Sequence, residues 1–205
     1  MSSRYVHVID DEEAIRRSMQ LMLRVLGYET RAFDSATMFL AAQPELASGC
    51  VLLDLRMPEI DGLEVQRRLR ANGADHSVIV MSGHGDLGLA VTAMEQGAVA
   101  FLEKPFSRAA LQEVLEVAFM RLEDPNGYRE YLRSAAALLQ ELEPLEQRVL
   151  ELIARGHDSD AIAQQTGMAP AAIELARSRL YARLGAQTAT EVLRLAFAAR
   201  RAASD

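Results

Sequence analysis

The chain has 205 residues, 50% of them hydrophobic and 25% charged, and its formal net charge is −7. This length allows one or two domains with self-sufficient cores, and the negative charge excludes a uniformly basic nucleic-acid coat. A single cysteine, Cys50, excludes a disulfide framework and a cysteine-based zinc site. No apolar run reaches the roughly 18 residues of a membrane span and no signal peptide is recognisable, so we expect a cytoplasmic protein without a membrane partner.

The basic residues are distributed unevenly between two types. Of the 22, one is a lysine, Lys104, and the others are arginines. Compositional drift accounts for the arginines, but it does not explain the single lysine. A compact ammonium differs from a guanidinium where a side chain must approach a small anion in a tight site. The composition therefore raises the question of which anion Lys104 binds.

Short aliphatic runs alternate with stretches of helical period over the first 120 residues. The predicted strands are 5–9, 29–32, 50–55, 78–81 and 99–102, of which 29–32 is the weakest. The predicted helices between them are 13–26, 35–41, 63–70, 88–96 and 108–122. This alternation predicts an α/β fold with a doubly wound, five-stranded parallel sheet of the flavodoxin-like kind. Ligands of such sheets bind at the carboxyl ends of the strands.

The pattern breaks at 123–127, where the sequence reads Glu-Asp-Pro-Asn-Gly. Beyond this point every predicted element is a helix, at 128–141, 145–154, 159–166, 170–184 and 188–201. We therefore predict a first domain at 1–122, a helical linker at 123–141 and a small all-α domain at 142–205.

Polar side chains follow four of the predicted strands. Asp10 and Asp11 come after the first strand, Asp54 ends the third, Ser82 follows the fourth and Lys104 follows the fifth. A single aspartate at a strand end is usually only a loop cap. Because parallel strands end at a common edge, however, five polar groups on four strand ends predict one shared site.

Crowded carboxylates repel one another unless a cation or shared protons compensate them. Ligand sets made only of oxygen atoms favour a hard ion such as Mg²⁺. A carboxylate beside Mg²⁺, a hydroxyl and an ammonium can receive a phosphoryl group as an acyl phosphate. A phosphoryl group is therefore the anion that we expect Lys104 to bind.

Four motifs resemble the receiver domain of two-component response regulators in their order, spacing and strand context. They are Asp-Asp-Glu-Glu at 10–13, Leu-Asp-Leu-Arg-Met-Pro-Glu-Ile-Asp-Gly at 53–62, Ser-Gly-His-Gly at 82–85 and Glu-Lys-Pro-Phe at 103–106. The resemblance covers about 120 residues. It implies that Asp54 is the phospho-acceptor for a sensor histidine kinase. It also implies that the chain is not an enzyme beyond slow autodephosphorylation.

The same resemblance implies the roles of the surrounding groups. The implied Mg²⁺ ligands are oxygen donors from Asp10, Asp11, Asp54 and the backbone carbonyl of Arg56. Asp11 would bind the ion directly and Asp10 mainly through water. Ser82 and Phe101 match the switch pair, in which the hydroxyl turns toward the phosphoryl group and the ring turns inward. Lys104 would contact the phosphoryl oxygens.

Residues 142–184 resemble the LuxR-type helix-turn-helix of NarL/FixJ response regulators, chiefly at apolar and glycine positions. The matching residues are Glu146, Val149, Leu150, Ile153, Ala154, Gly156, Ile162, Ala163, Ile173, Glu174, Arg177, Leu180, Leu184 and Gly185. The surface departs from that family, because alanines at 169, 172 and 176 replace polar groups and Asp160 replaces a basic one. These changes remove phosphate contacts, on which DNA affinity depends.

The recognition helix still offers candidate DNA contacts. They are Glu174, Leu175, Arg177, Ser178, Arg179 and Arg183. Glu174 could accept a hydrogen bond from cytosine and Leu175 could touch a thymine methyl group, whereas Ser178 is no bidentate donor for guanine. The arginines would anchor the DNA backbone. We therefore expect weak or partner-assisted DNA binding.

Three readings of the function follow. In the first, phosphorylation of Asp54 favours a homodimer that pairs two helix-turn-helix domains on DNA and regulates transcription. In the second, the C-terminal domain binds a protein rather than specific DNA. The third is a phosphatase of the haloacid dehalogenase type, which needs an aspartate two residues after its nucleophile, where this chain has Arg56.

Overall fold

The computed structural model describes residues 4–83 and 87–203, and the chain divides into two compact units. The first unit comprises residues 1–84 and 96–125, and the second comprises residues 85–95 and 126–205. Among the helices of these described ranges, none has the length and apolar character needed to cross a bilayer.

The first unit is built on a five-stranded parallel sheet with strand order β2-β1-β3-β4-β5, which confirms the predicted doubly wound fold. Its strands are β1 (Tyr5–Ile9), β2 (Glu29–Phe33), β3 (Gly49–Asp54), β4 (His76–Ser82) and β5 (Ala100–Glu103). The weakest predicted strand is the edge strand β2. Its residues alternate in exposure, because an edge strand is less completely covered than a central one. The central strands β3 and β4 are buried throughout, which explains their continuous aliphatic runs.

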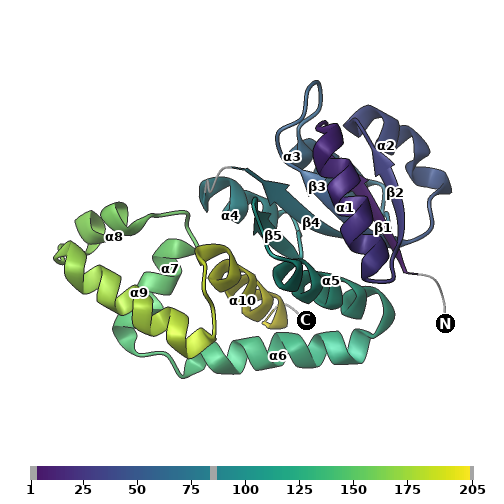
Figure 1. Cartoon of the computed structure of the whole chain (residues 1–205). Helices are drawn as coiled ribbons and strands as arrows, with labels where there is room; N and C mark the ends of the chain where they lie inside the picture. The colour runs from purple at the N-terminus through teal and green to yellow at the C-terminus, as the bar shows by residue number, and fades with distance from the viewer. Residues whose placement is uncertain (1–3, 84–86, 204–205) are drawn as a thin grey trace. The chain divides into compact units, whose positions relative to one another are not determined.

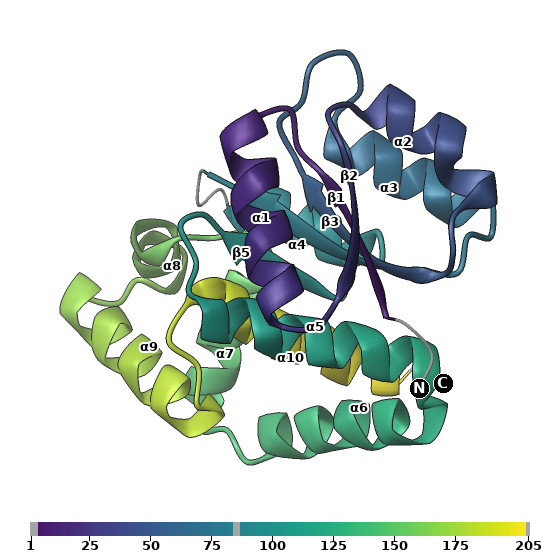
Figure 2. The same cartoon turned by 45° about the vertical axis from the view of Figure 1, so that its right-hand side comes forward.

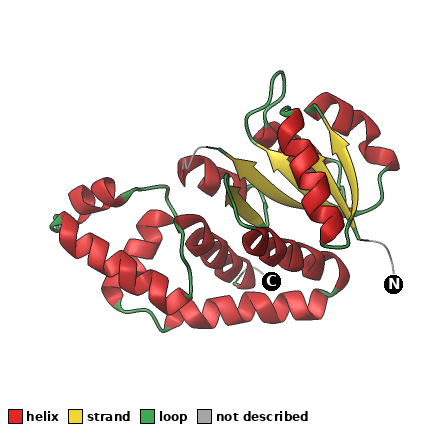
Figure 3. Ribbon diagram, viewed as in Figure 1, coloured by secondary structure: helices red, strands yellow, loops and turns green. Residues whose placement is uncertain are grey.

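Helices cover both faces of this sheet (Figures 1 and 2). They are α1 (Glu13–Val25), α2 (Ala36–Ala42), α3 (Gly62–Ala71) and α5 (Arg108–Glu123), with a short 3₁₀ turn, η1 (Gln43–Glu45), after α2. Helices α1 and α5 lie on one face, and α2 and α3 lie on the other, so the strands form an inner layer (Figure 3). Ser35 and Ser107 cap α2 and α5 by accepting hydrogen bonds from the amides of Met38 and Ala110.

The start of α3 approaches the end of β3 closely. A Cβ atom at Gly62 would lie 2.4 Å from the backbone oxygen of Asp54. The Gly62 amide donates to the Leu55 carbonyl at 3.0 Å, which holds this approach in place. Only a residue without a side chain fits here, so Gly62 determines how α3 packs behind the carboxyl end of β3.

The second unit is helical, as expected for the C-terminal region. Its helices are α4 (Leu87–Glu95), α6 (Pro125–Gln140), α7 (Pro144–Ile153), α8 (Ser159–Thr166), α9 (Pro170–Leu184) and α10 (Ala189–Ala202). Helix α6 occupies the segment predicted to be a helical linker, and Leu132 and Ala135 of this helix are buried with Ala198 of α10. Helix α4 packs against α10 and groups with the second unit, although the sequence places it in the first domain. The domain boundaries at 122 and 141 remain a prediction.

Candidate functional site

The carboxyl ends of β1, β3 and β5 bring three charged side chains together. Lys104 donates to Asp10 Oδ2 and to Asp54 Oδ1, with both Nζ–O distances at 2.6 Å. Asp10 is fully buried and Asp54 is 6% exposed, whereas the Lys104 side chain is 16% exposed. Residues 94 and 50 positions away in sequence thus meet this lysine at one edge of the sheet, as the strand-end pattern predicts.

The remaining carboxylate oxygens of this cluster accept backbone hydrogen bonds. Asp54 Oδ2 accepts from the Arg56 amide at 2.7 Å, and Asp10 Oδ1 accepts from the Glu12 amide at 2.9 Å. The Leu55 amide donates to the Met81 carbonyl at 3.0 Å, which ties the end of β3 to β4. Both carboxylates are therefore held in fixed orientations by local backbone geometry.

Burial and the charged neighbours shift the pKa values of Asp54 and Lys104 in opposite directions. Burial raises the pKa of Asp54 above its ordinary value, although hydrogen bonds from Lys104 and the Arg56 amide oppose this shift. Burial alone would lower the pKa of Lys104, but its hydrogen bonds to Asp10 and Asp54 outweigh burial and the net shift is upward. The ammonium is thus kept charged where it meets both carboxylates.

The donor set at this edge fits a hard divalent cation. Asp10, Asp11 and Asp54 carry three negative charges against the one positive charge of Lys104, and their donor atoms are all oxygen. Asp11 is exposed beside the buried pair. Within residues 4–83 and 87–203, no three acidic, histidine or cysteine side chains are already gathered as a metal site. The residues supply the right chemistry and charge, while the ligand set predicted for Mg²⁺ remains a prediction.

The two residues that match the switch pair are both buried. Ser82 ends β4 and is 1% exposed, and its backbone oxygen accepts from the Lys104 amide at 2.7 Å. Phe101 lies on β5 opposite Val80, and its ring is 3% exposed. The serine is therefore joined to the lysine through the backbone. His84 and Gly85, which belong to the same sequence motif as Ser82, lie outside the described residues.

The helical unit contains a helix-turn-helix formed by α8 and α9. Asp158 caps α8 by accepting from the Ala161 amide, and Gly167 ends α8 in a left-handed conformation. Helix α9 presents five of the six candidate DNA contacts to solvent, namely Glu174, Leu175, Ser178, Arg179 and Arg183. The arrangement matches a helix that could enter a DNA groove.

The arginines of α9 differ in their surroundings. Arg177 is half-buried and donates to Ser159 Oγ and, at 2.9 Å, to Tyr181 Oη. Arg183 donates to Glu143 Oε1 at 2.8 Å and to Glu146 Oε1 at 3.0 Å. These two guanidinium groups already have partners inside the unit, which the sequence did not indicate.

The sequence at 143–146 indicates a capping box, although it does not indicate the contact of these glutamates with Arg183. Glu143 and Glu146 form a capping box at the start of α7, and Glu146 is 2% exposed. A buried glutamate needs a compensating charge, and Arg183 supplies it.

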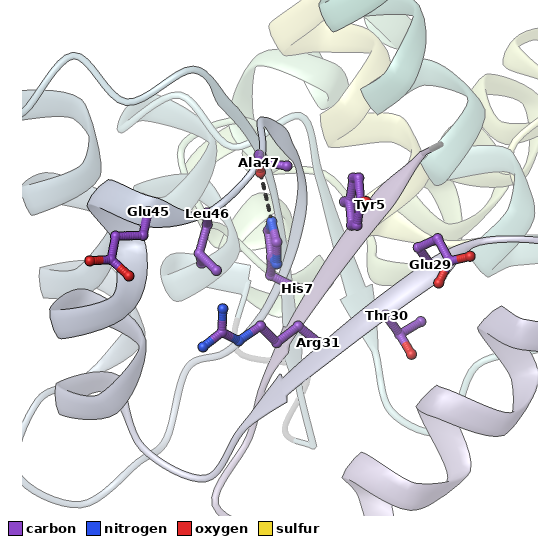
Figure 4. A pocket seen from close by; sticks show the side chains of 8 residues that line it. All are labelled: Tyr5, His7, Glu29, Thr30, Arg31, Glu45, Leu46 and Ala47. Carbon is purple, nitrogen blue, oxygen red and sulfur yellow. Dashed lines mark hydrogen bonds between the residues drawn. The ribbon is translucent and has the colours of Figure 1, made fainter. Parts of the chain in front are cut away.

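A hollow of about 350 Å³ lies at the opposite, amino-terminal end of the strands (Figure 4). It is lined by Tyr5, His7, Glu29, Thr30, Arg31, Glu45, Leu46 and Ala47. His7 Nε2 lies 3.0 Å from the Ala47 carbonyl oxygen, and the His7 ring meets that of His76 edge-on at 5.4 Å. The hollow is separate from the carboxylate cluster.

A buried acidic pair bridged by one lysine at the carboxyl edge of a doubly wound sheet defines the receiver class of signalling proteins. Residues 6–116 match the response regulator receiver domain family, and residues 140–196 match the LuxR family of bacterial regulatory proteins. The chain therefore belongs to the response regulators that carry a LuxR-type helix-turn-helix, and it is a transcription regulator of the two-component class.

Several relatives align over almost the whole chain. The transcriptional regulatory protein FixJ of Bradyrhizobium diazoefficiens is 37% identical over 195 residues, which is 95% of each chain. The tetrathionate response regulatory protein TtrR of Salmonella typhimurium is 34% identical over 92% of this chain and 90% of its own length. The crystal structure of full-length FixJ from B. japonicum aligns over 98% of this chain and 99% of its own, with 36% identity and a TM-score of 0.59. These likenesses favour transcription regulation over the protein-binding alternative and over the phosphatase reading.

Proposed function

We propose that Asp54 accepts a phosphoryl group from a sensor histidine kinase and that this modification controls DNA binding by the C-terminal helix-turn-helix. The 2.6 Å contact of Lys104 with both Asp54 and Asp10 carries the proposal. It places an ammonium beside the acceptor carboxylate, where it would neutralise oxygens of an incoming phosphoryl group. The match to both families supports a kinase as the source of the phosphoryl group and DNA as the target.

In the transfer step, a carboxylate oxygen of Asp54 forms a bond to phosphorus as the bond from phosphorus to the donor's leaving group breaks. The product is an acyl phosphate, and Asp54 has no need to lose a proton when it reacts as the carboxylate. Lys104 exchanges its contact with Asp54 Oδ1 for contacts with the phosphoryl oxygens, while the Arg56 amide keeps the carboxyl group oriented. Slow hydrolysis of this acyl phosphate would return the protein to its resting form.

Asp10, Asp11, Asp54 and the backbone carbonyl of Arg56 would hold Mg²⁺ at this edge. The ion would supply positive charge against the transferring phosphoryl group. Asp10 is already fixed by Glu12 and Lys104, so the exposed Asp11 is the carboxylate that is free to approach an ion without breaking a buried contact.

Ser82 and Phe101 would report the modification. The Ser82 hydroxyl would turn to donate to a phosphoryl oxygen, and this turn would hold the Phe101 ring in the inward position in which it is already buried. This change would favour a homodimer that pairs two helix-turn-helix units on DNA. This activity needs access to both a kinase's phosphohistidine and the chromosome, so we expect it in the cytoplasm.

The test is a gel-shift titration on promoter DNA recovered with the protein from its source cells. We expect acetyl phosphate with Mg²⁺ to increase the affinity of the wild type and the fraction of dimer in solution, and to leave Asp54→Ala unchanged. The complex should weaken as salt rises, because phosphate contacts release counterions. A wild type that forms no salt-sensitive complex at micromolar concentration, with or without phosphodonor, would contradict the DNA-binding output.

A further inference from the structure

Arg16, on the first turns of α1, contacts the acidic loop that follows β1. Its Nη1 atom donates to the Asp10 carbonyl at 2.9 Å and to the Asp11 carbonyl at 2.8 Å. One guanidinium nitrogen thus holds the backbone of two successive residues whose side chains belong to the carboxylate cluster. We propose that Arg16 is a positioning residue of the Mg²⁺ site, and this inference rests on the proposed function.

Within residues 4–83 and 87–203, the other hydrogen bonds of this loop fall on Asp10 and Glu12 rather than on Asp11. Glu12 occupies the N-cap position of α1, but its side chain makes no capping hydrogen bond. The Asp10 side chain is fixed by the Glu12 amide and by Lys104, whereas Asp11 is exposed. The two hydrogen bonds from Arg16 therefore fix the backbone between Asp10, whose carboxylate is held, and Asp11, whose side chain is exposed. Contacts that orient metal-ligating groups commonly have a strong effect on the affinity for the metal.

The charge of Arg16 and its hydrogen bonds have opposite effects on a bound cation. A guanidinium near the site repels Mg²⁺, so loss of the charge alone would strengthen Mg²⁺ binding. Loss of the two carbonyl contacts would release the loop and weaken Mg²⁺ binding. The direction of the change in Mg²⁺ affinity therefore distinguishes positioning from a purely electrostatic role.

Arg17, the next residue on α1, provides a matched control. Its Nη2 atom pairs with Glu13 Oε1 at 2.5 Å, and its side chain is 77% exposed. Arg17→Gln removes the same charge from the adjacent position of the same helix and leaves the carbonyls of Asp10 and Asp11 in contact with Arg16. A comparison of Arg16→Gln with Arg17→Gln therefore isolates the hydrogen bonds.

The experiment is a Mg²⁺ titration of the unphosphorylated full chain, followed through backbone amide NMR shifts of residues 10–12 and 54–56. We expect Arg16→Gln to raise the Mg²⁺ dissociation constant about tenfold, a size usual for the loss of an orienting contact. Arg17→Gln should stay within about twofold of the wild type. Arg16→Lys keeps the charge with altered geometry, so it should lie between them, and it carries the test if Arg16→Gln does not fold.

Two negative outcomes have different meanings. If Arg16→Gln and Arg16→Lys bind Mg²⁺ as tightly as the wild type or more tightly, Arg16 has no positioning role. If the wild type itself shows no Mg²⁺-dependent shifts, the metal site of the proposed function is wrong and this assignment falls with it. A thermal melt of each variant shows whether a changed dissociation constant accompanies loss of the fold.

Discussion

The Nζ atom of Lys104 lies 2.6 Å from Oδ1 of Asp54, although 50 residues separate them in sequence. The single lysine of the chain is thus in direct contact with the carboxylate proposed to accept a phosphoryl group. A charge of the same sign on an arginine would have a different shape and reach, which makes this contact testable by a conservative substitution.

We expect Lys104→Arg to reduce the rate of Mg²⁺-dependent phosphorylation and the resulting gain in DNA affinity, each by about tenfold. A planar guanidinium is too large to replace an ammonium between Asp10 and Asp54 without displacing one of them. Labelling with a radioactive phosphodonor and gel-shift titration measure the two effects. If the arginine variant behaves as the wild type does, the single lysine is an accident of composition.

The second prediction concerns the approach of α3 to β3. Gly62→Ala places a Cβ atom 2.4 Å from the Asp54 backbone oxygen, so the backbone must shift at the acceptor residue. We expect a loss of about 1–3 kcal/mol in the free energy of unfolding, measured by urea denaturation. Gly83→Ala is the control, because a Cβ at Gly83 meets no described atom within 4 Å. Equal stability of the two variants would mean that the close approach is unimportant.

The third prediction concerns His7 and His76, which meet edge-on beside Phe39. Burial is the main cause that lowers the pKa of both rings below the ordinary value near 6.5. The unfolded chain therefore binds protons more readily than the folded protein does. The free energy of unfolding keeps this contribution in full above about pH 6.5 and loses it as the pH falls below that value. Urea denaturation between pH 7.5 and about 5.5 measures this decline.

The control for the third prediction is the double variant His7→Gln/His76→Gln. It removes the His7 ring from the hollow shown in Figure 4 and the His76 ring that meets it edge-on. Its free energy of unfolding should depend less steeply on pH over this interval, even if its stability at pH 7.5 is lower. A wild type whose stability is level from pH 7.5 to about 5.5 would show that the two rings are not held neutral.

The fourth prediction separates the arginines of α9. Arg179 is exposed, whereas Arg177 and Arg183 are bound to neighbours within the helical unit. We expect Arg179→Ala to weaken DNA binding on all sequences and to reduce the slope of log affinity against log salt by about 0.9, the value for one phosphate contact. Arg133→Ala, an exposed position on α6, is the control and should leave the slope unchanged. An unchanged slope in Arg179→Ala would remove this residue from the interface.

The sheet and most of the cluster could be predicted because both follow from local pattern. Buried parallel strands read as continuous aliphatic runs, and parallel topology then places Asp10, Asp54 and Lys104 at one edge. The weak strand at 29–32 was harder to predict, since an edge strand alternates in exposure and resembles a loop.

Other features depend on tertiary contacts that no local pattern encodes. The contacts of Arg16 join a helix to two backbone carbonyls, and an arginine on an amphipathic helix resembles an ordinary exposed residue. Glu59 adopts a left-handed backbone conformation with φ at 65°, which a glycine or asparagine would have suggested but a glutamate does not. The partners of Arg183 lie 37 and 40 residues away.

The most direct test of the central claim is the mass of the intact protein after incubation with acetyl phosphate and Mg²⁺, compared between the wild type and Asp54→Asn. The wild type should gain the mass of one phosphoryl group, and the gain should disappear without Mg²⁺ and in the variant, because an amide oxygen is a poor nucleophile. A phosphoryl group that persists on Asp54→Asn would contradict the assignment of Asp54 as the acceptor.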